Sequence, residues 1–181
     1  NAQVDGDDFV FVGVDGVQLS HEIESYDSGS GSLVVWVNVS LSSTVDTSFY
    51  VYYGNAICGN QEDVVGTWNG DFRAVHHLNE DWSTAVGHFK DSTVFGHDGT
   101  LVDVDRDSES DVGMVGDGFR LNGDADVIDL GVIDFDYPIS YSAWMKSDEI
   151  DANACVLGRF WTGYYLGTWN WGSGLLREKV Y

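Results

Sequence analysis

The sequence predicts an all-β chain, in which a small β-domain precedes an antiparallel β-sandwich. Short runs such as VVWVNV at 34–39 and FYVYYGN at 49–55 are rich in β-branched and aromatic residues and end in Gly, Asn or nearby polar residues. Half-buried strands joined by tight turns have this composition. The runs recur at roughly 8–12 residues, the spacing of a sandwich. With one proline against 22 glycines, the turns must use Gly, Asn and Asp.

In the first part of the chain we expect strands over 9–14, 17–26, 33–39 and 48–53. Asp15-Gly16 is a turn signal between the first two. The polar stretch after these strands predicts a domain boundary. We therefore expect a first domain over 1–58, a linker over 59–72 and a second domain over 73–181.

The second part shows further strand patterns and no convincing amphipathic helix. Its Asp-rich stretch 103–111 predicts an exposed loop. The expected strands cover 100–104, 118–122, 126–130, 139–146, 154–160 and 163–169.

The charge of the chain excludes two classes of partner. The net charge is −22, and all eight Lys and Arg residues lie at Arg73 or later. Nucleic acids and anionic membrane surfaces are bound by clustered cations, so we expect neither as a partner. No apolar run approaches the roughly 20 residues of a bilayer span, so this segment is not expected to insert into a membrane. The acidity fits a solvated surface in a salty habitat, cation binding by some Asp residues, or both.

Two cysteines, Cys58 and Cys155, lie outside any CxxC motif. This argues against zinc and redox chemistry and leaves a disulfide between them open.

The phrases DGVQLSHEIESYD, VVWVNVSLSS and TSFYVYYGN resemble the DUF2341 family, a small all-β domain of unknown function in secreted and surface proteins of archaea and bacteria. The resemblance covers roughly residues 5–57. Ser20, Ser40 and Ala56 depart from it, because proline is usual at these three positions. The resemblance implies an extracellular or cell-surface location.

The phrases AVHHLNE, DSTVFGHDGTL, VGDGFRLNGDADVIDLG and ISYSAWMKSD resemble a LamG or concanavalin A-like jelly roll over 73–181. Such domains commonly follow DUF2341 in one polypeptide and are usually longer, so we expect an incomplete jelly roll. Trp144, within ISYSAWMK, is expected in its core.

Four residues near strand ends are candidate calcium ligands: Asp91, Asp98, Asn122 and Asp124. Calcium takes six to eight oxygen ligands from carboxylates and loop carbonyls. The LamG resemblance implies one such ion at the rim of the jelly roll. The alternative is that Asp91 and Asp98 form Asx-turns and the others are solvated.

The late aromatic residues Tyr164, Trp169 and Trp171 are candidate sugar contacts, because aromatic rings match the apolar faces of sugars. Alternation along a strand would place about half of such rings in the core instead. Asn38, in Asn-Val-Ser, fits the glycosylation pattern and is plausible as an acceptor in a secreted protein.

No complete catalytic constellation is present. Glu22 and Glu24 share one face of a strand, and paired carboxylates are used by glycosidases, but the DUF2341 resemblance accounts for this segment without catalysis. His76 and His77 would face opposite sides of a strand, which argues against a zinc site.

The sequence predicts a non-catalytic module of a larger extracellular surface protein that serves adhesion or carbohydrate binding, with calcium as a candidate cofactor. The alternative is a structural subunit of a filament, sheath or virion appendage whose strand edges pair with neighbouring copies. A glycoside hydrolase is the least favoured reading.

Overall fold

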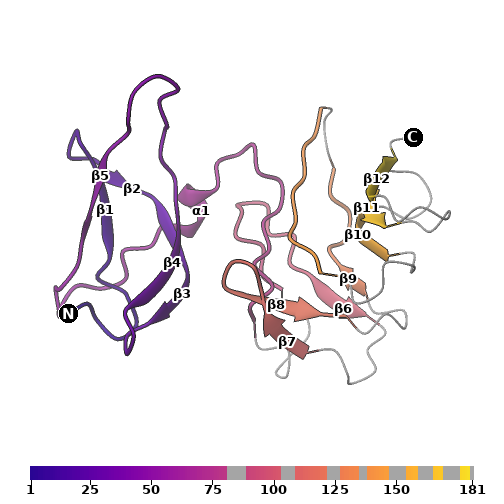
Figure 1. Cartoon of the computed structure of the whole chain (residues 1–181), viewed down its shortest axis with the longest axis horizontal. Helices are drawn as coiled ribbons and strands as arrows, with labels where there is room; N and C mark the ends of the chain where they lie inside the picture. The colour runs from indigo at the N-terminus through magenta and orange to yellow at the C-terminus, as the bar shows by residue number, and fades with distance from the viewer. Residues whose placement is uncertain are drawn as a thin grey trace. The chain divides into compact units, whose positions relative to one another are not determined.

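The computed structural model describes residues 1–80, 89–102, 109–121, 127–134, 138–146, 154–158, 165–168 and 176–179. The chain divides into two compact units, Asn1–Phe135 and Asp136–Tyr181. Figure 1 labels the strands and the helix along the chain. The described residues form short antiparallel strands and one helical turn. The expectation of a mostly β chain is confirmed, whereas the described strands do not close into a jelly roll.

The first sheet contains β1 (Val10–Gly13), β2 (Gln18–Leu19) and β5 (Phe49–Tyr52) in the order β2-β1-β5. Phe11 of β1 stands opposite Leu19 on one side and Val51 on the other. The turn between β1 and β2 contains Gly16 with a φ of 81°, which glycine adopts without steric cost. The Asp15-Gly16 signal therefore predicted this turn correctly.

A hairpin follows, formed by β3 (His21–Asp27) and β4 (Ser32–Val37). In its turn the Asp27 carboxylate accepts hydrogen bonds from the backbone of Gly29 and the hydroxyl of Ser30. The single strand expected over 17–26 is wrong, because the chain changes sheets at Ser20. On one side of Ser20, β2 pairs with β1, and on the other β3 pairs with β4.

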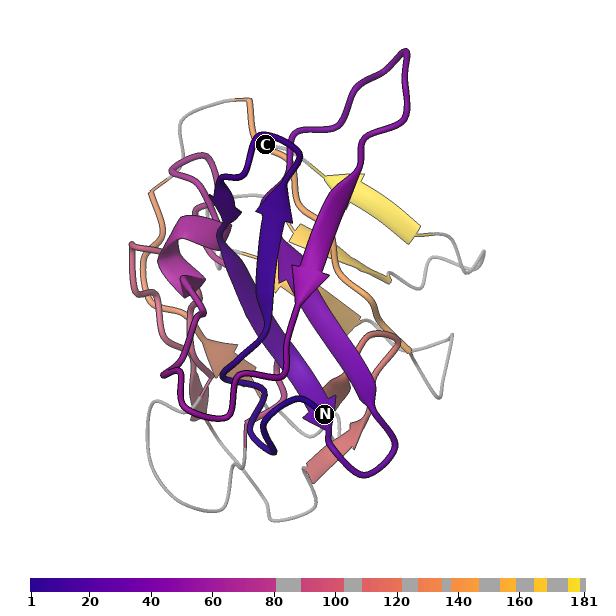
Figure 2. The same ribbon diagram turned by 90° about the vertical axis from the view of Figure 1, so that its left-hand side faces the viewer.

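The strands β1–β5, which Figure 2 draws in indigo to purple, enclose an aromatic core. Phe9 and Phe11 are buried, and the Phe9 ring meets the Tyr26 ring edge-on at 5.0 Å between centroids. The Phe11 ring lies 4.9 Å from the imidazole of His21, which is 0% exposed. Phe9 and Phe11 therefore belong to the core of the first sheet.

Among the described residues, neither ring nitrogen of the buried His21 makes a hydrogen bond of good geometry, and the Leu19 carbonyl acts on the ring only weakly. Burial lowers the pKa of His21 more than the Leu19 carbonyl and the charges of Glu62 and Asp63 raise it. An unsatisfied buried polar group costs about 1–3 kcal/mol. The native histidine is therefore less favourable here than an apolar ring of similar size.

We expect His21→Phe to raise the free energy of unfolding by about 1 kcal/mol, because it removes the unpaired nitrogens and keeps the contact with Phe11. The lowered His21 pKa destabilises the fold as pH falls below the ordinary value near 6.5, and the variant should lose that part of the acid sensitivity. Urea unfolding at neutral and mildly acidic pH measures both effects. A loss of stability at neutral pH would contradict the prediction and indicate a role for the ring nitrogens.

Helix α1 (Val64–Thr67) is one turn long and lies in the region 59–72 that was expected to be a linker. The Asp63 side chain caps it by accepting a hydrogen bond from Gly66 N at 3.1 Å. Asp63 also accepts from the hydroxyl of Ser20, at 2.8 Å, which ties the helix to the start of β3. The helix thereby fixes the position of the next residue, Trp68.

The later part of the first unit contains two strand pairs. Strand β6 (Thr100–Val102) pairs with β9 (Val127–Asp129), and β7 (Glu109–Val112) pairs with β8 (Asp117–Arg120). The expected exposed loop over 103–111 is wrong for 109–111, because β8 supplies hydrogen-bond partners that outweigh the polar composition of β7. The predicted strands near 100–104, 118–122 and 126–130 are confirmed as shorter elements.

Phe89 is the centre of packing in this part, with 0% exposure. Its backbone bridges to Gly99, and its ring meets the Phe119 ring at 4.8 Å between centroids. A Cβ atom on Gly99 would lie 2.6 Å from Ile128 Cγ2, so only glycine allows this approach.

The second unit contains β10 (Ala154–Gly158), β11 (Tyr165–Thr168) and β12 (Leu176–Lys179) in that order. Strands near 154–160 and 163–169 were predicted, and β12 was missed because Leu-Arg-Glu-Lys lacks β-branched residues. The strand expected over 139–146 is wrong: this segment pairs with no described strand. Trp144 is 73% exposed rather than in a core, since no ladder buries one of its faces. In the described part of the chain, no helix has the length and apolarity of a bilayer span.

Candidate functional site

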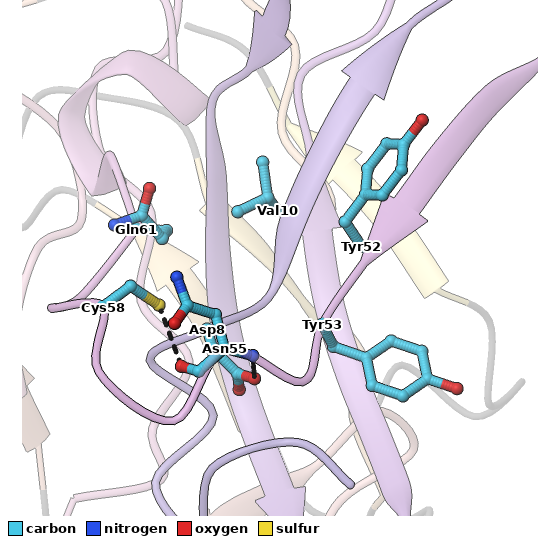
Figure 3. A pocket seen from close by; sticks show the side chains of 7 residues that line it. All are labelled: Asp8, Val10, Tyr52, Tyr53, Asn55, Cys58 and Gln61. Carbon is cyan, nitrogen blue, oxygen red and sulfur yellow. Dashed lines mark hydrogen bonds between the residues drawn. The ribbon is translucent and has the colours of Figure 1, made fainter.

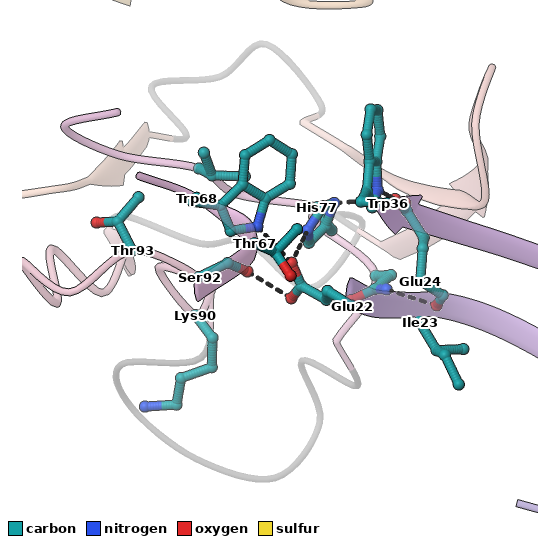
Figure 4. A network of polar contacts seen from close by, with 12 residues as sticks. Glu22, Ile23, Glu24, Trp36, Thr67, Trp68, His77, Lys90, Ser92 and Thr93 are labelled. Carbon is teal, nitrogen blue, oxygen red and sulfur yellow. Dashed lines mark hydrogen bonds and ion pairs between the residues drawn. The ribbon is translucent and has the colours of Figure 1, made fainter. Parts of the chain in front are cut away.

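The most developed side-chain cluster lies on the hairpin β3–β4. Alternation along β3 was expected to place Glu22 and Glu24 on one face, and both carboxylates contact the same imidazole, that of His77 (Figure 4). Opposite Glu22 in the ladder is Trp36 of β4. The strand pattern and the hairpin register thus bring two acids and one indole to one side of the hairpin.

Glu22 accepts hydrogen bonds on both carboxylate oxygens. Its Oε2 accepts from Trp68 Nε1 at 2.5 Å and lies 3.1 Å from His77 Nε2, and its Oε1 accepts from the Ser92 hydroxyl at 2.7 Å. Burial raises the pKa of Glu22, but the hydrogen bonds from His77, Ser92 and Trp68 outweigh it and hold the pKa below its usual range. Glu22 is therefore an ionised carboxylate in a buried site.

Glu24 occupies the other side of the imidazole. Its side chain is 2% exposed, its Oε2 lies 2.9 Å from His77 Nδ1, and the same oxygen accepts from Trp36 Nε1 at 2.5 Å. The indoles of Trp36 and Trp68 lie 5.8 and 6.0 Å from the His77 ring between centroids. The imidazole is thus held by two carboxylates and flanked by two indoles.

This geometry suits a structural role. The side chains of Glu22 and His77 are each 11% exposed, so a substrate would reach them only if the cluster opened. Each oxygen of Glu22 already accepts a hydrogen bond from a protein donor. A general base must lie within hydrogen-bond reach of its substrate, and here the protein's own donors occupy those positions.

A second polar cluster contains the predicted calcium ligands Asp91 and Asp98. Asp91 accepts hydrogen bonds from the backbone of Val75, Thr93 and His97 and from the Thr93 hydroxyl. Burial raises the pKa of Asp91, but these hydrogen bonds lower it by more, so the pKa lies below its ordinary value. Asp98 accepts from Asp91 N at 3.0 Å and pairs with the Lys90 ammonium, which lowers its pKa.

The calcium prediction is not decided by these contacts. The oxygens of Asp91 and Asp98 are used as in the Asx-turn alternative, and the described residues contain no group of three or more His, Cys, Asp or Glu that could hold a metal ion. The other two candidate ligands, Asn122 and Asp124, lie outside the described residues.

A shallow hollow of about 250 Å³ lies beside β5 (Figure 3). Its lining combines aromatic, amide and acidic side chains: Asp8, Val10, Tyr52, Tyr53, Asn55, Cys58 and Gln61. The rings of Tyr52 and Tyr53 are 57% and 61% exposed. Aromatic faces beside amide groups are the combination that holds a sugar ring.

Asp8 fixes the shape of this hollow from beneath. It is 2% exposed and accepts hydrogen bonds from the backbone of Gln3, Gly54 and Asn55 at 2.5–3.0 Å. Burial raises the pKa of Asp8, and these three backbone hydrogen bonds lower it more. The Asp8 carboxylate thereby fixes the backbone at the end of β5. Its oxygens accept hydrogen bonds from backbone amides instead of facing a ligand.

The remaining predicted site residues are placed as follows. Tyr164, Trp169 and Trp171 lie outside the described residues, so their role in sugar contact stays a prediction. Asn38 is exposed just after β4, and its Nδ2 donates to the Gly66 carbonyl at 2.9 Å. Cys58 is a free thiol whose sulfur lies 3.4 Å from the Asn55 carbonyl oxygen.

Sequence reasoning missed His77, Trp68 and Ser92 as members of the Glu22 cluster. His77 was judged only as a metal ligand beside His76, and the two histidines do face different partners: the His76 ring meets the His97 carbonyl. The available signal was the pair of acids on one face of β3, which requires a buried cation or several donors nearby. Nothing in the spacing says which of the five histidines supplies that cation.

A family model described as a domain of unknown function, DUF2341, matches residues 5–85. Residues 5–85 are a DUF2341 domain. The prediction of this family is confirmed, and the DUF2341 domain extends past the expected residue 57 to include Trp68 and His77. Ser92 lies beyond the domain. Nothing in the comparisons supports a following LamG domain over 73–181, and no curated protein or solved structure matches the chain.

Proposed function

We propose that this chain is a non-catalytic adhesion or carbohydrate-binding module of a larger extracellular surface protein. The observation that carries the proposal is the aromatic surface of β5 and the hollow beside it. Five consecutive residues there are 40–61% exposed: Phe49, Tyr50, Val51, Tyr52 and Tyr53. Burying such rings against a ligand would release water from apolar surface, and a contiguous exposed apolar patch is typical of a binding surface.

The chemistry around the hollow favours a neutral sugar. No Lys or Arg occurs before Arg73, so an anionic ligand would meet only like charges on this part of the chain. The Asn55 side chain is exposed at the rim, and Gln61 lines the wall, so amide groups are available to hydroxyls. A volume of about 250 Å³ suits one ring rather than a long oligosaccharide.

Two further parts of the proposal concern the second block of the chain. A LamG-like jelly roll over 73–181 would add the aromatic residues Trp169 and Trp171 as a second sugar contact. Calcium would assist only through a site that Asn122 and Asp124 complete, since Asp91 already accepts several hydrogen bonds.

We expect Tyr53→Ala and Tyr52→Ala to weaken binding of neutral mono- and oligosaccharides about tenfold or more, because burying a large apolar side chain against a ligand contributes roughly 1.5–3 kcal/mol. Calorimetric titration against a panel of neutral sugars measures this. Tyr50→Ala is the matched control, since Tyr50 is 55% exposed on the same strand but does not line the hollow.

Absence of sugar binding by the native chain, or equal losses in Tyr50→Ala and Tyr53→Ala, would contradict the β5 site. If binding is lost only in Trp169→Ala or Trp171→Ala, the sugar site lies in residues 73–181, and the proposal of a carbohydrate-binding module still holds.

A structural subunit is the second candidate, and one observation favours it. Strand β5 is at the edge of its described sheet, and each of its four residues is exposed. An exposed apolar edge can pair with a neighbouring copy. Light scattering on the same samples separates the two candidates: growth in particle size without sugar indicates assembly, and saturable sugar binding at constant size indicates the module.

A further inference from the structure

Two carboxylates flank the His77 ring. Its Nε2 forms a hydrogen bond with Glu22 Oε2 at 3.1 Å, and its Nδ1 forms an ion-pair contact with Glu24 Oε2 at 2.9 Å. A neutral imidazole has only one N–H, whereas an imidazolium carries one on each nitrogen. Two carboxylates this close to the ring nitrogens therefore favour the charged form of His77.

The cluster joins the DUF2341 domain to residues that follow it. Glu22 and Glu24 come from β3, whereas Ser92, which donates to Glu22, lies beyond residue 85. Glu24 also lies against the β7–β8 turn, where a Cβ on Gly116 would come within 2.6 Å of its Oε1. The carboxylates thus contact later parts of the same compact unit at His77, Ser92 and the turn at Gly116.

The backbone beside His77 has to be held in place. Leu78 has a φ of 59°, in the left-handed region that residues with a side chain rarely adopt. Such a conformation persists only where surrounding contacts over-determine it. The nearest fixed contacts are the two His77 ion pairs and the hydrogen bond from the Asn79 amide to the Glu24 carbonyl.

We propose that His77 is a pH-dependent latch, in which the imidazolium between Glu22 and Glu24 holds the described residues 74–80 and 89–99 on the hairpin β3–β4. While His77 is charged, the two buried acids share one cation. When it loses its proton, one carboxylate loses its partner inside the protein and the segment can release. The latch is independent of sugar binding, since none of its residues lines the hollow beside β5.

The charged groups that face His77 favour its protonated form. Burial lowers the pKa of His77, but the hydrogen bond to Glu22 and the charges of Glu22, Glu24 and Glu80 raise it more, with a net increase. Strand β4 and the residue after α1 contribute only the neutral indoles of Trp36 and Trp68. Lys90, the nearest cation on the Ser92 segment, is 67% exposed, extends away from the cluster and pairs with Asp98 (Figure 4). The β7–β8 turn brings Asp117 next to Gly116, and no cation.

These shifts define a pH window. Because the pKa of His77 is raised on folding, its contribution is complete below the ordinary histidine value near 6.5 and is lost as pH rises through the folded pKa. Because the pKa of Glu22 is lowered, its contribution is present above the ordinary glutamate value near 4.3 and is lost as pH falls through the folded pKa. The latch is closed in mildly acidic solution and opens toward alkaline pH.

The test uses the full chain and the variant His77→Gln, which is similar in size and cannot become a cation. The native melting temperature should fall between about pH 6 and pH 9, and the fall should be smaller in His77→Gln. His97→Gln is the control, because the His97 ring stacks on Phe95 and contacts no carboxylate among the described residues. The difference between variants removes the general effect of increasing negative charge.

Local opening is read from hydrogen exchange at the indole N–H groups of Trp36 and Trp68, which donate to Glu24 and Glu22. After correction for the intrinsic rate, their protection should fall over the same pH range in the native chain and not in His77→Gln. The NMR titration of the His77 ring in the native chain should have its midpoint above about 6.5.

Identical pH profiles for the native chain and His77→Gln, or a His77 midpoint at or below its ordinary value, would overturn the latch. If His77→Gln does not fold, the ring titration of the native chain and the exchange profile of the Trp36 and Trp68 indole N–H groups still decide between the two outcomes.

Discussion

Replacing Phe89 with alanine is expected to lower the free energy of unfolding of the first unit by about 3–5 kcal/mol. The ring is 0% exposed and packs against Phe119, and its backbone bridges to Gly99. Truncation would remove most of its buried apolar area and leave a cavity that the bridged backbone cannot close. For a chain of this size we expect a fall in melting temperature of roughly 10 °C.

Phe95→Ala is the matched control for Phe89→Ala. Phe95 is a phenylalanine six residues further along, is 40% exposed and lies under the Arg73 guanidinium at 4.7 Å from its ring centroid. Its loss should cost about 1 kcal/mol or less. Urea unfolding followed by tryptophan fluorescence compares the two, and equal losses would mean that Phe89 is not at the centre of a core.

Glu22→Ala is expected to destabilise the same unit by about 3–5 kcal/mol. The change leaves the Trp68 indole N–H and the Ser92 hydroxyl without their acceptor and leaves the buried His77 with one carboxylate instead of two. Removing one member of a buried ion pair costs more than the pair contributes, because the partner stays desolvated. Glu22→Gln keeps the shape and should lose less.

Asp71→Ala provides the comparison for Glu22→Ala, since it removes an acid from an exposed position in the loop after Trp68. Its effect should be within about 0.5 kcal/mol, as for ordinary surface substitutions. Chemical denaturation near pH 6, where the cluster is fully formed, measures both variants. A Glu22→Ala loss no larger than that of Asp71→Ala would show that the cluster carries no net stability.

Most strands were predictable because strand-forming residues and their alternation are visible within a short stretch of sequence. The alternation in HEIESYD and the β-branched run before Asn38 predict β3 and β4 without knowledge of partners. The division into sheets was not predictable, because the change of partner at Ser20 depends on the hydrogen bonds to Asp63 and on the pairing of β2 with β1. Strands β7 and β12 were missed because their polar sequences become strands only through the neighbour each one pairs with.

In the candidate sites, too, the local features were predictable and the tertiary contacts were not. Glu22 and Glu24 were placed on one face correctly, since a period of two is a local property. The imidazole between them comes from a segment more than 50 residues away in sequence, and its choice depends on the tertiary fold. The aromatic residues 49–53 were read as a strand, but their exposure is set by the position of β5 at the edge of the sheet, which the pattern does not encode.

The contact between Glu22 and Ser92 bears on how this domain can be inherited. Residues 5–85 are the part that sequence comparison recognises, yet the hydroxyl that completes the Glu22 hydrogen bonds lies seven residues beyond that boundary, at position 92. A recombination event that joined residue 85 to an unrelated sequence would transfer Glu22 without its full set of donors and Glu24 without the glycine turn that covers it. The piece that can be shuffled between genes without loss of stability is therefore longer than the piece that defines the family.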